Sequence, residues 1–132
     1  MLGKVISSST MVDFIKANAG SLQAIGIFFP FLLAAILKSA QGSSTVAITT
    51  TAGILAPLME TLGFVTPVSA ALCVMAIGAG AMTVSHANDS YFWVVTNFGD
   101  MTPEQGYKTQ TGMTLAIGIA AIIGIFVLNL IF

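Results

Sequence analysis

The chain has 132 residues, of which 56% are hydrophobic and only 7% are charged. Because about a quarter of the residues of a soluble domain are charged, this composition excludes an ordinary soluble domain. A net charge of −1, without a single arginine, also excludes a nucleic-acid partner. One histidine and one cysteine cannot form a structural zinc site or an internal disulfide, so we expect no metal and no cofactor.

The few charges separate four long neutral blocks, at 17–37, 39–59, 61–88 and 109–132. A helix crosses a hydrocarbon core of about 30 Å with about 20 mostly apolar residues, so each block is long enough to span a bilayer. The blocks therefore predict an all-α integral membrane protein, a single membrane domain with about three to four transmembrane helices in the lipid bilayer.

Residues 1–20 mix apolar and charged side chains, which is typical of a helix at the membrane interface or of a truncated span. The apolar run at 21–37 predicts the first complete span. We expect Pro30 to bend this helix. We also expect Lys38 to extend from its end toward the polar surface, as lysines at the ends of membrane helices do.

The next block, 39–59, begins with seven hydroxyl residues between Ser39 and Thr51 and is a poor candidate for a lipid-facing helix. Non-helical backbone at membrane depth is tolerated only where it is buried in protein or lines an aqueous cavity. We therefore predict a re-entrant or broken element, with its tip at 42–45 and its end at Pro57. The alternative is a hydroxyl-rich helix packed against its neighbours.

Residues 65–84 are apolar and rich in small residues, which predicts a buried span. Within it, Ala76, Gly78 and Gly80 allow close approach of another helix. The segment 85–98 then starts with a polar break and continues with aromatic and apolar residues, which predict a short helix.

Residues 99–108 contain glycine, proline and charged residues, which is typical of an aqueous loop. Residues 109–132 predict the last span, in which Ala116, Ala120 and Gly124 recur at every fourth position as a packing stripe. The four lysines are too few to orient these spans by the positive-inside rule.

Two ionisable side chains, His86 and Asp89, lie in the polar break. An ionisable group in a membrane segment costs at least ~2.5–3.5 kcal/mol, so such a group usually faces a cavity and serves a pathway or a proton relay. In a helix, the spacing of three puts both on one face, where they can share a proton. We therefore expect Asp89 and His86 to carry the coupling proton of a transport cycle. Alternatively, Asn88, Asp89 or Ser90 caps a helix that begins at Tyr91.

The hydroxyl-rich patch before Val46 is neutral, which suits recognition of a hydroxylated anion without a metal. If this patch meets the polar break, amides at the helix ends supply partial positive charge for the anion. We therefore predict that both segments bind an anionic polyol, through Gln41, Gly42, Ser43, Ser44, Thr45, Ser85, His86, Asn88 and Ser90.

The stretches QGSSTVA at 41–47 and SHANDSYFW at 85–93 resemble two signature stretches of the gluconate permease family. The resemblance extends over about residues 20 to 132. It implies a multi-pass carrier of the bacterial inner membrane that moves gluconate or a related small hydroxy acid by proton symport. It also implies inverted repeats and re-entrant hairpins, with Ser43 to Thr45 at a hairpin tip and 86–90 at a broken helix near the solute.

Members of that family are several times longer, and this chain resembles their C-terminal portion. We therefore expect a segment of a transporter, which works with a partner polypeptide or as a homo-oligomer. The alternative is a non-transporting membrane module, or a truncated fragment, that packs against a larger partner. We do not expect an enzyme, because Ser85 or Ser90 lies too close in sequence to His86 and Asp89 for a hydrolase triad.

Overall fold

The computed structural model describes residue 5 and residues 10–18 and 25–132. These residues are helical wherever they are regular, and no strand occurs among them, as the sequence predicts. The interfacial or truncated helix expected at 1–20 and the span expected at 21–37 lie partly outside the described residues. The helical elements are α2 (Thr10–Ala17), α4 (Phe28–Gln41), α5 (Ser44–Leu55), η1 (Ala56–Leu58), α6 (Pro67–Met82), α7 (Ser90–Phe98), α8 (Pro103–Gly106), the π-helical turn η2 (Tyr107–Thr111) and α9 (Gly112–Ile131).

Helices α4 and α5 are joined by a tight turn of two residues, Gly42 and Ser43. Gly42 has a φ of 70°, which glycine adopts without the usual steric cost, and its N–H donates to Lys38 O at 2.8 Å. Ser43 caps α5, because its Oγ accepts a hydrogen bond from Val46 N at 3.3 Å. The break expected at 42–45 is therefore present, while re-entry of this helix pair into a membrane stays a prediction.

Pro30 lies in the first turn of α4, where a backbone N–H has no intrahelical acceptor. Because the expected helix at 21–37 lies partly outside the described residues, its bend at Pro30 stays a prediction. One expectation for the first span is wrong. Lys38 does not extend to the surface, because it lies in the last turn of α4 and is only 1% exposed. Its position is explained by a partner from a distant part of the chain, described below.

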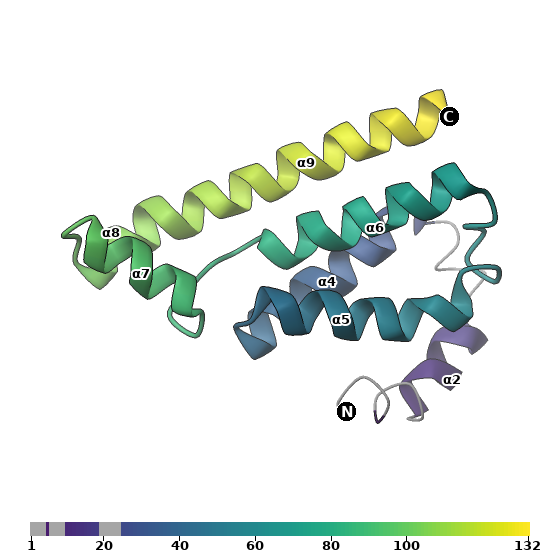
Figure 1. The fold of residues 1–132 in the computed structure, drawn as a ribbon, viewed down its shortest axis with the longest axis horizontal. Coiled ribbons are helices and arrows are strands. Elements are labelled where there is room, and N and C mark those ends of the chain that lie inside the picture. Colours follow the sequence, from purple (N-terminus) through teal and green to yellow (C-terminus); the bar gives the residue numbers. More distant parts are fainter. Residues whose placement is uncertain (1–4, 6–9, 19–24) are drawn as a thin grey trace.

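Helix α6 forms the centre of the core, since it packs against α4, α5 and α9 (Figure 1). Thr66 and Ser69 form a reciprocal capping box at its start. Ala76 is fully buried, and a Cβ on Gly80 would clash with the backbone oxygen of Phe31 in α4. The predicted close approach is confirmed at these two positions, whereas Gly78 has open space around it.

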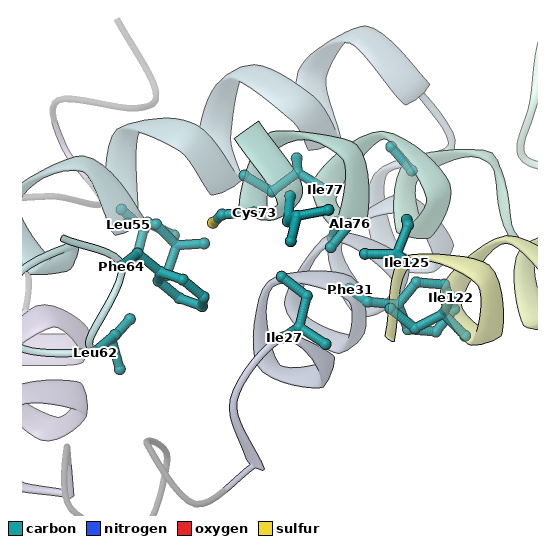
Figure 2. Packing of buried hydrophobic residues seen from close by; sticks show 14 of the residues in the cluster. Ile27, Phe31, Leu55, Leu62, Phe64, Cys73, Ala76, Ile77, Ile122 and Ile125 are labelled. Atoms are coloured by element: carbon teal, nitrogen blue, oxygen red, sulfur yellow. The ribbon is translucent and has the colours of Figure 1, made fainter. Parts of the chain in front are cut away.

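The core beneath α6 is apolar and draws side chains from four helices and from the turn before α6 (Figure 2). In water, burial of each such side chain would stabilise the fold by roughly 1.5–3 kcal/mol through the hydrophobic effect. In a membrane, van der Waals contacts between closely packed helices stabilise the core instead. The core therefore fixes how α4, α5 and α9 are arranged around α6. Its labelled members include Ile27, Phe31, Leu55, Leu62, Phe64, Cys73, Ala76, Ile77, Ile122 and Ile125.

The expected loop at 99–108 is wrong for most of its length, because the chain is helical again from Pro103. Thr102 and Gln105 form a capping box around Pro103, which occupies the first helical position. From there the helix continues through η2 into α9. The resulting helix, Pro103–Ile131, has 29 residues.

Among the described residues, only this long helix is by itself long and apolar enough to cross a membrane. It supports the span predicted at 109–132. The other apolar helices, Phe28–Gln41, Ser44–Leu58 and Pro67–Met82, are shorter, so the predicted number of crossings stays a prediction.

The predicted packing stripe of α9 does not pack against the described residues of this chain. Ala116, Ala120 and Gly124 are exposed, and the buried positions of the helix are Gly118, Ile122 and Ile125. The helix contacts the end of α6 at Gly118, where a Cβ would clash with the Thr83 side chain. That contact sets the rotation of α9 and leaves the predicted stripe facing away from the core.

Candidate functional site

A buried ion pair joins two parts of the chain that are 51 residues apart. Lys38 Nζ lies 2.6 Å from Asp89 Oδ2, and the two side chains are 1% and 7% exposed. Lys38 comes from the last turn of α4, and Asp89 directly precedes α7. Because an unpaired buried charge is strongly destabilising, each of these side chains requires the other.

Ser85 holds the same carboxylate and connects it to the long C-terminal helix. Its Oγ donates to Asp89 Oδ2 at 2.8 Å. Its backbone N–H donates to Thr114 Oγ1 at 3.0 Å, and its carbonyl accepts from Thr111 Oγ1 at 2.5 Å. Thr111 lies in the π-helical turn η2, a type of irregularity found frequently at functional sites. The ion pair is therefore linked through Ser85 to α9.

Asp89 is also the N-cap of α7, because its Oδ1 accepts a hydrogen bond from Tyr91 N at 3.1 Å. The capping alternative is therefore confirmed for Asp89, although the helix begins at Ser90. Since Oδ2 binds Lys38 and Ser85, capping and ion pairing use different oxygens of one carboxylate. The cap fixes the carboxylate where the ion pair needs it.

The turn between α4 and α5 meets the polar break between α6 and α7, and both lie at the same end of the helices (Figure 1). Asn88 Nδ2 donates to Ser39 O at 2.7 Å. A Cβ on Gly42 would overlap the backbone oxygen of Asn88, so only glycine allows this approach. The two polar segments are therefore in contact, which is the condition set by the predicted solute site.

A cavity of about 90 Å³ lies beside the ion pair. Ser44 is the first residue of α5 and Tyr91 lies in the first turn of α7, so two helix N-termini border it and contribute partial positive charge. One ammonium, two helix ends and several hydroxyls are groups that bind the carboxylate and hydroxyls of a small organic acid. The cavity is lined by Lys38, Ser44, Met82, Ser85, Asp89, Tyr91, Thr114 and Ile117.

The predicted solute-binding residues take different places around this cavity. Ser44 and Ser85 line it. Gly42 and Ser43 form the neighbouring turn, and Asn88 fastens the break to that turn. These five residues are thus brought together by the fold.

The remaining predicted solute-binding residues do not line the cavity. Gln41 is half-buried, and its Oε1 is buried without a hydrogen-bond partner. Thr45 and Ser90 are exposed. His86 and Asp89 do not share a helical face, because the break is not helical there and Asp89 N donates to His86 O. No hydrogen bond joins the half-buried His86 imidazole to the Asp89 carboxylate.

Sequence reasoning missed Lys38, Thr111 and Thr114 as parts of the site. A signal was present for Lys38, since it lies between two long neutral blocks and its charge needs either the surface or a partner. The two threonines carry no comparable signal within an apolar helix. Thr111 ends the π-helical turn and Thr114 lies in the first turn of α9, and both hydroxyls bond to the Ser85 backbone.

A charged pair buried among apolar helices, beside a small cavity bordered by helix ends, is characteristic of an integral membrane protein that handles a solute. The comparison with known families agrees with this class. A family profile described as "GntP family permease" matches residues 1–131, and the chain belongs to this family. The family consists of permeases rather than enzymes, and the resemblance to gluconate permeases is confirmed.

Three curated relatives illustrate the similarity. The chain is 33% identical over 128 residues to a gluconate permease of Pseudomonas aeruginosa, covering 97% of the chain and 28% of that protein. It is 41% identical over 98 residues to a gluconate permease of Zymomonas mobilis, covering 74% and 21%. It is 31% identical over 149 residues to the Gnt-II system L-idonate transporter of Escherichia coli, covering 98% and 33%.

The chain thus spans a third or less of the length of these relatives. No solved structure matches the chain.

Proposed function

We propose that the chain takes part in the transport of gluconate or a related small hydroxy acid across the bacterial inner membrane, coupled to a proton. The observation that carries this proposal is the ion pair of Lys38 and Asp89 beside a small cavity that hydroxyl-bearing residues also line. Relatives named for gluconate and L-idonate transport, and one named as an inner membrane permease, support the solute class and the location.

In this proposal the solute binds where the turn at Gly42 and Ser43 meets the polar break. Ser44 donates a hydrogen bond to a solute oxygen, and Ser85 lines the same cavity with its hydroxyl on Asp89. Gln41, whose buried Oε1 has no hydrogen-bond partner, lies at the end of α4 beside the turn. Thr45, His86, Asn88 and Ser90 complete the predicted set from the rims of the two segments. The segments 39–59 and 85–98 act as the re-entrant hairpin and the broken helix of a multi-pass carrier.

The proton is carried by Asp89, with His86 as the second candidate. A partner polypeptide or a second copy of the chain supplies further membrane segments around the cavity. This arrangement is suggested by the largely exposed apolar surface of α9 and by the greater length of the relatives.

Uptake of labelled gluconate by vesicles containing the purified chain tests the proposal. We expect saturable uptake that unlabelled gluconate inhibits. Ser44→Ala and Thr45→Ala each remove one neutral hydrogen bond of roughly 0.5–1.5 kcal/mol and should raise the apparent KM about 2- to 10-fold. Lys108→Gln, on the exposed surface, serves as the control. Absence of uptake by the wild-type chain would refute autonomous transport and favour a non-transporting module that packs against a larger partner.

A further inference from the structure

The cavity beside Lys38 contains one cation and one anion. Lys38 Nζ is almost completely buried, and its acidic partner is Asp89 at 2.6 Å. The lining residues contributed by α5, α6 and α9 are Ser44, Met82, Thr114 and Ile117, none of which is titratable. The site is therefore balanced in charge only while one anion accompanies Lys38.

An organic acid that enters this cavity brings a second carboxylate. One buried ammonium would then face two carboxylates, and such a site carries an uncompensated negative charge in a low-dielectric environment. Two carboxylates that share one site avoid this cost when one of them binds a proton. Binding of the anion and protonation of Asp89 are thus energetically linked.

Resting on the proposed function, we infer that Lys38 exchanges its partner during the cycle and that this exchange couples one proton to one organic anion. In the empty site Lys38 pairs with the Asp89 carboxylate. In the loaded site Lys38 pairs with the solute carboxylate, and Asp89 is neutral. As the solute binds, the Asp89 carboxylate takes a proton from hydronium in the adjoining water, so one O–H bond forms on Asp89 and one breaks in the hydronium. When the solute leaves, Asp89 returns the proton to a water molecule, and no other bond changes.

The surroundings of Asp89 suit both protonation states. The Ser85 hydroxyl donates to the carboxylate in the ion pair, and the same oxygen can accept a hydrogen bond from the protonated acid. The bond from Tyr91 N to Oδ1 persists in either state. Asp89 therefore stays in place while Lys38 changes partner. A cavity of about 90 Å³ has room for a group the size of a carboxylate, since one water occupies about 30 Å³ in the liquid.

Other titratable groups near Asp89 are few. Tyr91 of α7 lines the cavity, and His86 is half-buried in the polar break. The Tyr107 hydroxyl accepts from Ala87 N in that break. Among these groups, His86 is the competitor for the coupling proton that the variants below test.

Calorimetric titration of the purified full chain with gluconate tests the exchange. Binding enthalpies measured at pH 7 in buffers of different ionisation enthalpy give the number of protons taken up per gluconate. We expect about one proton for the wild type, together with a Kd that rises about tenfold per pH unit. Asp89→Asn should bind gluconate with no proton uptake and with a Kd independent of pH, because Lys38 remains. Lys108→Gln, at the exposed pair with Glu104, should behave as the wild type.

A second variant separates binding from folding. The double variant Lys38→Met/Asp89→Asn removes both buried charges, and its fold is checked by the fluorescence of Trp93, which is hydrogen-bonded to the polar break. We expect it to fold and to bind gluconate at least 10-fold more weakly than Asp89→Asn. Equal affinity of these two variants would overturn the role of Lys38.

Three other outcomes are decisive. Gluconate binding by the wild type without proton uptake would overturn the exchange and leave gluconate as the solute of the proposed function. Loss of proton uptake in His86→Gln, with uptake retained in Asp89→Asn, would overturn the exchange and assign the proton to His86. No gluconate binding by the wild type would overturn the proposed function and the exchange together.

Discussion

The ion pair of Lys38 and Asp89 can be tested as a structural element by a double-mutant cycle. Its atoms are 2.6 Å apart, so the attraction is about 6 kcal/mol at an effective dielectric constant near 20, before desolvation is subtracted. Lys38→Met leaves a buried carboxylate without its cation and should lower the free energy of unfolding by about 3–5 kcal/mol. Asp89→Asn should cost a similar amount, although asparagine retains the cap on α7.

The double variant should recover most of this loss and lie within about 1 kcal/mol of the wild type, because it buries no charge. Denaturation in detergent, followed by the fluorescence of Trp93, the single tryptophan, gives the four free energies. The exposed pair of Lys108 and Glu104 provides a control cycle with a coupling energy close to zero. If the buried pair also showed negligible coupling, Lys38 and Asp89 would not depend on each other as described.

Two further substitutions test how the site is positioned. Gly42→Ala should lower the free energy of unfolding by at least ~1–2 kcal/mol, because alanine is unfavourable at a φ of 70° and its Cβ would overlap Asn88 O. Thermal denaturation compares this variant with Gly53→Ala, since a Cβ on Gly53 would meet open space. Equal effects of the two substitutions would contradict the close contact at Gly42. Thr114→Val leaves the buried N–H of Ser85 without its acceptor and should lower the free energy of unfolding by about 1–3 kcal/mol. Thr114→Ser keeps a hydroxyl acceptor and should leave the stability unchanged. An unchanged stability of the valine variant would show that α9 does not support the site through Thr114.

The two polar segments of the candidate site, the turn at Gly42 and the break before α7, could be predicted from the sequence. Hydroxyl residues and glycine within a neutral apolar block indicated the turn at Gly42, because such a segment cannot face lipid as a plain helix. The cluster from Ser85 to Ser90 likewise indicated the break before α7. Helical class and membrane character followed from these local patterns, whereas contact between the two polar segments was only a condition of the predicted solute site.

What the sequence did not provide was the pairing of side chains across the fold. The partner of Asp89 is Lys38, set by the packing of α4 against α6, whereas the sequence suggested neighbouring His86. The loop predicted at 99–108 is wrong from Pro103 on, because the capping box of Thr102 and Gln105 starts a helix there. The glycine and proline in this segment had indicated a loop. The packed face of α9 depends on its contact with Thr83, which no periodicity in the helix reveals.

Accumulation of labelled gluconate in proteoliposomes under an inward proton gradient shows whether Asp89 couples transport to protons. We expect the wild-type chain to accumulate gluconate above equilibrium and a protonophore to abolish the excess. We expect Asp89→Asn to equilibrate gluconate without accumulating it. Full accumulation by the Asp89→Asn variant, or wild-type uptake that is independent of the proton gradient, would contradict proton coupling through Asp89.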